Sequence, residues 1–243
     1  MKKYKILIFD LDDTLINNTE NIRHAYTKMI ESVGESYTEP SFKKWYSIDR
    51  KFWEDWQEGL IELPENLRNE TGKKSETFLN WLRAQRVLIY FDNQISLEKA
   101  IELNHLYMNS LKENVIAINN AYTTLQYLSS KYNIIVATNG PKIATKEKLS
   151  KINCLQFMQK VLSADMFGYV KPKKEFFEGI QHTLNNYNTD EYLIIGDSLS
   201  SDIAFAMNCN FDSCWFNPTN AQLPNKYKPT MVINDLIELT QKL

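Results

Sequence analysis

Four aspartates follow short apolar runs in this sequence. Asp10 and Asp12 come directly after the first run, and Asp197 follows a later run with Asp202 about one helical turn beyond it. Carboxylates that converge at one place raise one another's pKa unless a cation neutralises them. Mg²⁺ favours oxygen ligands, needs only a few carboxylates and leaves room for water and a phosphate oxygen. We therefore expect a Mg²⁺ site with Asp10 and Asp197 as ligands.

Asp10, the residue that ends its apolar run, is also suited to act as a nucleophile. A carboxylate can attack phosphorus and form an acyl phosphate, which splits one difficult displacement into two easier ones. Asp12 can then reach the opposite side of the phosphorus, protonate the leaving oxygen and later accept a proton from the hydrolytic water. These two residues predict hydrolysis of a phosphate ester through an aspartyl-phosphate.

Further polar residues follow the other apolar runs. The Thr138 hydroxyl and the backbone amides near Asn139 and Gly140 are expected to bind the equatorial phosphate oxygens, where charge spreads in the transition state. Lys171 is expected to bind phosphate and to shield the carboxylates. Taken singly, each has an ordinary explanation: paired aspartates often cap a helix, and a lone lysine is usually a solvated surface charge. Only the set points to catalysis.

The elements that must position these residues follow from the apolar pattern. Short apolar runs predict buried strands, and segments with apolar residues three or four apart predict helices between them. Alternating units of this kind predict an α/β fold with a doubly wound parallel sheet, whose ligands bind beyond the carboxyl ends of the strands. The predicted strands are Tyr4–Phe9, Ile134–Ala137, Lys160–Leu162, Tyr192–Ile195 and Ser213–Phe216, and the helices are Asn120–Lys131, Ala144–Ile152, Lys174–Leu184 and Asp202–Asn208.

A helical insertion interrupts this alternation after the first strand. A strand-helix-strand crossover needs little more than about 30 residues, but a far longer stretch separates the first two predicted strands. We expect a catalytic core at residues 1–16 and 113–243 and an all-α cap domain at 17–112, with hinges near Ile16 and Glu113. The cap helices are predicted at Glu20–Val33, Ser41–Glu58, Ser75–Gln85 and Ser96–Leu111.

Composition narrows the choice of partners. The 243-residue chain has a net charge of −2 and no basic stretch, which disfavours nucleic acid as a partner. Cys154, Cys209 and Cys214 are odd in number and widely spaced, so reduced, packed thiols are expected. The apolar run near the amino terminus is too short for a signal peptide or a membrane span. We expect a cytoplasmic protein, a monomer or a homodimer, that binds a small phosphorylated metabolite and not a membrane.

The motifs resemble those of the haloacid dehalogenase superfamily of phosphohydrolases. Residues 10–14 (DLDDT) resemble the first motif of that family, and residues 196–202 (GDSLSSD) resemble the fourth. Thr138 matches the second motif and Lys171 matches the third. The resemblance implies a Rossmann-like core with a helical cap that closes over the substrate and selects it. It also implies that the backbone carbonyl of Asp12 binds Mg²⁺ and that Asp202 supports the metal and the lysine from outside the ligand set.

A narrower resemblance is to bacterial pyrimidine 5′-nucleotidases. It depends on residues 53–59 (WEDWQEG), 137–140 (ATNG) and 214–218 (CWFNP), and it implies hydrolysis of nucleoside monophosphates such as UMP, dUMP and dTMP. A phosphatase or mutase for sugar phosphates stays open, since one fold serves many substrates. So does a phosphate-binding protein without turnover. A 2-haloacid dehalogenase is disfavoured, because members of that family dispense with Mg²⁺ and normally lack an acid at the position of Asp12.

Three further expectations concern packing. Asp13 is expected to cap a turn and to point away from the neighbours of Asp10 and Asp12. Trp45, Phe52, Trp53 and Trp56 are expected to form one aromatic cluster at helical spacing, with core packing favoured over stacking on a nucleobase. Asn210 stands where the family usually has a helix-ending glycine, and it is expected to adopt the left-handed conformation there.

Overall fold

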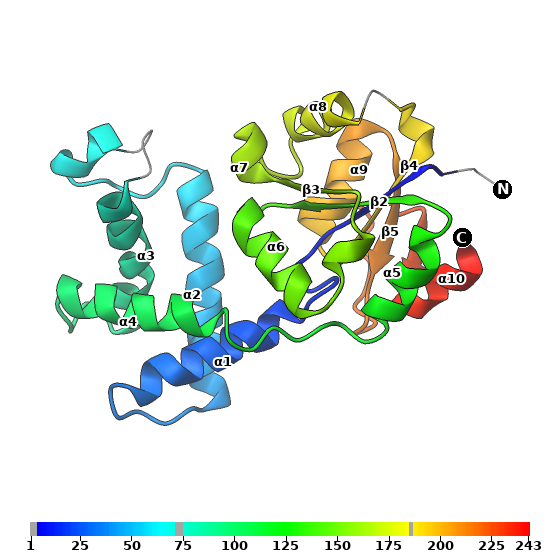
Figure 1. Ribbon diagram of the computed structural model, residues 1–243. Helices are drawn as coiled ribbons and strands as arrows, with labels where there is room; N and C mark the ends of the chain where they lie inside the picture. Colours follow the sequence, from blue (N-terminus) through cyan, green and yellow to red (C-terminus); the bar gives the residue numbers. More distant parts are fainter. Residues whose placement is uncertain (1–3, 71–74, 185–186) are drawn as a thin grey trace. The chain divides into compact units, whose positions relative to one another are not determined.

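A computed structural model describes residues 4–70, 75–184 and 187–243 of the chain (Figure 1). The chain divides into two compact units. Unit 1 contains the residues up to Asn18 and those from Val115 onward, and unit 2 contains Thr19–Asn114. The roles of a catalytic core and a cap for these units remain proposals.

Unit 1 is built on a six-stranded sheet in which every neighbouring pair is parallel, in the order β3-β2-β1-β4-β5-β6. The first strand is therefore central: Phe9 pairs with Val136 on one side and with Ile195 on the other. The strands are β1 (Ile6–Phe9), β2 (Asn133–Thr138), β3 (Lys160–Ser163), β4 (Tyr192–Gly196), β5 (Asp212–Phe216) and β6 (Met231–Ile233). The predicted α/β fold with a doubly wound parallel sheet is confirmed.

Helices cover both faces of this sheet because successive strand residues point to opposite sides. Leu7 and Phe9 of β1 pack in one hydrophobic cluster with residues of α5, α6 and α10, whereas Ile6 and Ile8 pack in the other with residues of α8 and α9. The helices of unit 1 are α5 (Ala121–Ser129), α6 (Lys142–Lys151), α7 (Ala164–Phe167), α8 (Lys174–Thr183), α9 (Ala204–Cys209) and α10 (Leu239–Lys242). The predicted helix at 202–208 begins earlier, as a π-helical turn at Leu199–Ile203 that precedes α9.

Unit 2 is helical in the part that the structure describes, and its helices match the predicted ones closely. They are α1 (Asn18–Glu31), α2 (Glu39–Gln57), a 3₁₀ helix (Glu65–Glu70), α3 (Glu76–Tyr90) and α4 (Leu97–Ser110). Their spacing predicts that the aromatic residues of α2 form one cluster, and this prediction is wrong. Trp45 is buried against α1, α3 and α4, whereas Phe52, Trp53 and Trp56 belong to a second cluster with Phe78.

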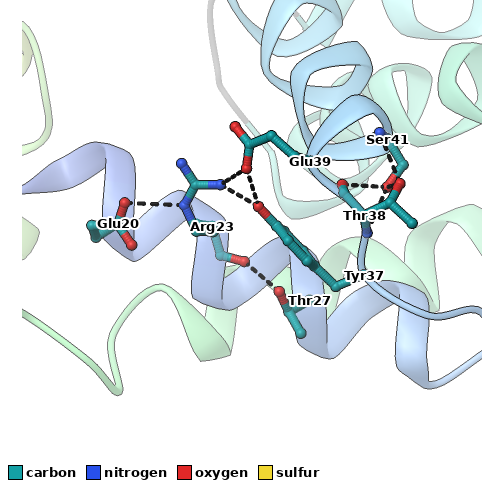
Figure 2. A network of polar contacts seen from close by, with 7 residues as sticks. All are labelled: Glu20, Arg23, Thr27, Tyr37, Thr38, Glu39 and Ser41. Carbon is teal, nitrogen blue, oxygen red and sulfur yellow. Dashed lines mark hydrogen bonds and ion pairs between the residues drawn. The ribbon is translucent and has the colours of Figure 1, made fainter.

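A polar network joins α1 to the start of α2 within unit 2 (Figure 2). The Arg23 guanidinium donates to Glu20 at 3.0 Å and to Glu39 at 2.6 Å, and it also contacts the hydroxyl of Tyr37. Thr38 caps α2, since its hydroxyl accepts from the backbone N–H of Ser41 at 3.2 Å. These contacts fix the angle at which the chain enters α2.

Among the described residues, none of the helices has the length and apolar character that crossing a membrane requires.

Candidate active site

The polar residues singled out in the sequence lie at the carboxyl end of the sheet. Asp10 directly follows β1, and its backbone N–H continues the ladder by donating to Ile195 of β4 at 2.9 Å. Thr138 is the last residue of β2, and Asp197 directly follows β4. Parallel strands bring their carboxyl ends to one edge, so these residues are neighbours in space although more than 180 positions separate the first from the last.

A buried lysine joins two of the aspartates. Lys171 lies between α7 and α8, and its Nζ is 2.6 Å from Oδ1 of Asp10 and 2.6 Å from Oδ1 of Asp202. The lysine side chain is only 1% exposed, so both ion pairs are shielded from solvent. Carboxylate oxygens of Asp10, Asp197 and Asp202 lie within 4.8 Å of one another.

This cluster holds protons more tightly than separate groups would. Burial raises the pKa of Asp10 well above its usual range, and the carboxylates of Asp202, Asp197 and Asp12 add to the rise although Lys171 opposes it. Burial alone would lower the pKa of Lys171, but Asp10 and Asp202 outweigh that effect and raise it. The negative charge of the neighbouring carboxylates therefore raises the pKa of both residues, in addition to burial at Asp10 and against burial at Lys171.

Asp197 is held by residues from two other segments. Its pKa is raised to about 7, first by burial and then by Asp202 and Asp13, while the hydroxyl of Thr14 opposes the rise. That hydroxyl donates to Oδ1 of Asp197 and accepts from its backbone N–H, both at 3.1 Å. Trp215 of β5 donates from Nε1 to the Asp197 carbonyl at 2.8 Å. Thr14 and Trp215 are not among the site residues predicted individually from the sequence.

Asp202 is packed directly against Gly196. A Cβ built on Gly196 would lie 2.2 Å from Oδ2 and 2.3 Å from Cγ of Asp202, so no larger residue fits there without moving the carboxylate. The same Oδ2 accepts from the backbone N–H of Ser198 at 3.1 Å. Glycine at the end of β4 thus allows Asp202 to reach Lys171.

The turn after β2 contacts the lysine loop. The backbone N–H of Gly140 donates to Oγ1 of Thr138 at 3.1 Å, which orients this hydroxyl. The Asn139 side chain donates to the carbonyl of Lys171 at 3.2 Å and accepts from its backbone N–H at 2.8 Å. Only the Asn139 backbone was considered in the sequence; its side chain fixes the loop that carries Lys171.

Asp12 has a different cationic partner from Asp10. The Nζ of Lys148, on α6, is 2.8 Å from Oδ1 of Asp12 and 3.3 Å from Oδ1 of Asn18. Lys148 was not among the candidate residues, because a lysine on an amphipathic helix looks like any solvated surface charge.

Asp13 is a turn residue, as predicted, but it lies closer to the other carboxylates than expected. Its φ of 60° places it in the left-handed region, as a turn residue, and its N–H donates to the Ile16 carbonyl at 2.7 Å. It does not stay remote from the carboxylates, however, because it contributes to the raised pKa of Asp197.

The residues present fit a divalent cation with oxygen ligands. Asp10 and Asp197 offer carboxylate oxygens at the edge of the sheet, and burial together with repulsion from neighbouring carboxylates raises the pKa of both, an effect that a bound cation would oppose. No histidine or cysteine takes part in the clustered donor set of the described residues. An all-oxygen set favours Mg²⁺ over softer metals.

Comparisons with known proteins agree with this site. A model of the family described as haloacid dehalogenase-like hydrolase matches residues 4–210. The pyrimidine 5′-nucleotidase YjjG of Escherichia coli is 24% identical, over 99% of this chain and 98% of its own length. A glyceraldehyde 3-phosphate phosphatase of Pyrococcus furiosus is 26% identical, over 100% and 94%.

The fold has a close counterpart among solved structures. The HAD-hydrolase YfnB of Bacillus subtilis, solved with bound magnesium, superposes with a TM-score of 0.83 at 24% identity, over 100% of this chain and 99% of that one. The family match spans all four motifs of unit 1 together with the whole of unit 2. The chain therefore belongs to the haloacid dehalogenase-like hydrolases.

Proposed function

We propose that this protein is a Mg²⁺-dependent phosphomonoester hydrolase that acts through an aspartyl-phosphate on Asp10. The arrangement around Lys171 carries the proposal. One buried ammonium contacts Asp10 and Asp202 at 2.6 Å each, beside the Asp197 carboxylate. Such a cluster leaves a carboxylate nucleophile next to positive charge that a phosphate can share.

The first step makes the covalent intermediate. A carboxylate oxygen of Asp10 attacks phosphorus, the bond from phosphorus to the leaving oxygen breaks, and Asp12 donates its proton to that oxygen. Thr138, the amides of Asn139 and Gly140, and Lys171 are the residues that we assign to the phosphate oxygens. Bound Mg²⁺, held by Asp10, Asp197 and the Asp12 carbonyl with Asp202 behind them, would neutralise the charge gathered between the carboxylates and the phosphate.

The second step restores the enzyme. Asp12, now a carboxylate, accepts a proton from water as the water oxygen attacks phosphorus. The bond between the Asp10 oxygen and phosphorus then breaks, and inorganic phosphate leaves. Asp12 ends the cycle with one proton, as it began, so the enzyme is ready for the next substrate.

For the substrate we propose a pyrimidine nucleoside 5′-monophosphate. The segments at 53–59, 137–140 and 214–218 support it, as does the likeness to YjjG along nearly the whole chain. A sugar phosphate is the second candidate, favoured by the likeness to a glyceraldehyde 3-phosphate phosphatase. In both cases the helical unit 2 is proposed as the cap that selects the substrate.

Phosphate release from a panel of nucleoside monophosphates and sugar phosphates tests this function. We expect activity with Mg²⁺, none after chelation, and a loss of at least about 10³-fold in Asp10→Asn, since the amide cannot attack phosphorus. Asp190→Asn, at an acid remote from the cluster, is the matched control and should keep full activity. Acid quenching with ³²P-labelled substrate should trap label on the wild type but not on Asp10→Asn. Full activity in Asp10→Asn would overturn the mechanism; activity confined to sugar phosphates would overturn only the substrate.

A further inference from the structure

Two aspartates that are two positions apart are held by lysines from different parts of the core. Lys171, in the loop before α8, contacts Asp10, whereas Lys148, on α6, contacts Asp12 at 2.8 Å. Side chains at positions i and i+2 of an extended segment lie on the same side, so one cation could have bridged both. Separate partners instead hold the two carboxylates apart.

The orientation of the Asp12 side chain depends mainly on its contact with Lys148. Its side chain is 37% exposed, and within the described part of the chain Lys148 is the side chain with which it forms an ion pair. An exposed carboxylate that rotates freely is seldom placed to donate a proton along a fixed direction, and small misplacements of a reacting group are costly. A cation at hydrogen-bond distance limits that rotation.

Lys148 is itself restrained on its other side. Its Nζ also donates to Oδ1 of Asn18 at 3.3 Å, and its side chain is 23% exposed. Helix α6 begins directly after the Thr138-Asn139-Gly140 turn, with Pro141 at its N-terminal cap. The helix that follows the phosphate-binding turn therefore also supplies the cation for Asp12.

We propose that Lys148 is a positioning residue that orients the Asp12 carboxyl group toward the leaving oxygen in the first step and toward water in the second. The inference rests on the proposed function and adds to it a residue outside the four motifs. Lys148 does not touch the phosphate in this proposal, and Asn18 fixes the lysine from the side of α1.

The nature of the leaving group separates this role from a structural one. A nitrophenolate leaves without being protonated, so p-nitrophenyl phosphate needs Asp12 only for the second step, whereas an alkyl phosphate such as UMP needs it for both. Lys148→Met with p-nitrophenyl phosphate should give a burst of nitrophenolate, one per active site, followed by turnover about 10–100-fold slower than wild type. With UMP the same variant should be slowed similarly, but without a burst.

Control variants test the assignment to Lys148. Lys146→Met removes an exposed lysine from the same helix and should match the wild type, and Lys148→Arg should recover most of the rate because it keeps a cation in reach of Asp12. Thermal unfolding of Lys148→Met should stay close to that of the wild type, since a partly exposed ion pair contributes little to stability. KM should change much less than kcat.

Three results would overturn the proposal. Wild-type rates in Lys148→Met would show that the ion pair is irrelevant to turnover. Slow nitrophenolate release without a burst would place Lys148 in the first displacement, as a phosphate contact. A fall in thermal stability that accounts for the lost activity would show that Lys148 has a structural role. If the wild type hydrolysed neither substrate, or if Asp10→Asn stayed active, the proposed function would fall first, and the positioning role with it.

Discussion

At the scale of the residue, the site contains more carboxylate groups than positive charges to balance them. The Lys171 ammonium contacts Asp10 and Asp202, and the Asp197 carboxylate lies beside them. Burial and repulsion between carboxylates raise the pKa of Asp10 and that of Asp197. Such an excess of negative charge makes the cluster receptive to protons or to Mg²⁺. The two must therefore compete.

This competition predicts how Mg²⁺ binding depends on pH. The pKa of Asp197 is raised to about 7, so its proton stabilises the fold at low pH and that contribution is lost as pH rises toward 7. Mg²⁺ should bind increasingly well over the same range, with the apparent Kd falling by up to about tenfold per pH unit between about pH 5 and 7. Titration calorimetry at several pH values measures this, and Asp197→Asn should weaken binding and flatten its pH dependence. A wild-type Kd for Mg²⁺ that does not change with pH would contradict competition between protons and Mg²⁺.

Residues of the site differ in how visible they are in the sequence. Asp10, Thr138, Lys171 and Asp197 stand out because each follows an apolar run or a motif at a strand end. The contact between Lys148 and Asp12 joins positions 136 apart and has no local signature. Thr14 lies inside the first motif, but its hydrogen bonds to Asp197 depend on the register of β1 against β4, which cannot be read from the sequence.

At the scale of the element, apolar runs located the strands well and their ends less well. All five predicted strands were found within about two residues of their observed bounds, because strands buried on both faces are continuously apolar. The sixth, Met231–Ile233, was missed. It has three residues, lies at the edge of the sheet, and its Val232 is exposed, so no buried run marks it.

The end of α9 allows a test of backbone conformation alone. Asn210 has φ 56° and ψ 46°, as expected for the left-handed residue that ends a helix, and it is exposed. Asn210→Ala should reduce the free energy of unfolding by about 1 kcal/mol, because alanine tolerates this region less well. Asn210→Gly, the matched control, should be neutral or slightly stabilising. Urea denaturation of both variants compares them, and equal stability of the alanine and glycine variants would contradict the conformational argument.

At the scale of the whole molecule, each unit has hydrophobic clusters of its own. Among the described residues, each of the four clusters takes its members from one unit. The chain leaves unit 1 and returns to it through two segments that pair with each other. Asn17 donates to the Ile116 carbonyl at 2.8 Å and Ile118 donates to the Leu15 carbonyl at 2.9 Å, around an antiparallel bridge from Ile16 to Ala117.

This pairing predicts that unit 1 folds without the insertion. A variant in which a short glycine-serine linker replaces residues 19–114 should unfold cooperatively and should still be stabilised by Mg²⁺, because the ends to be joined are already paired and both core clusters remain. Preference among phosphate esters should shrink to about tenfold or less if unit 2 selects the substrate. Circular dichroism and the substrate panel measure both effects. A variant without a cooperative transition would show that unit 1 needs the insertion to fold.

The central place of β1 also has a consequence for synthesis. Strand β1 leaves the ribosome before the other strands of its sheet, and its partners are at Asn133–Thr138 and Tyr192–Gly196, beyond the whole of unit 2. Unit 2 is continuous in the chain, so it can fold while β1 still lacks both neighbours. With translation at about 5–20 residues per second, an unpaired apolar strand must wait on the order of ten seconds. During that interval the nascent chain exposes the apolar segment that leads to Asp10, and chaperone dependence should be greatest then.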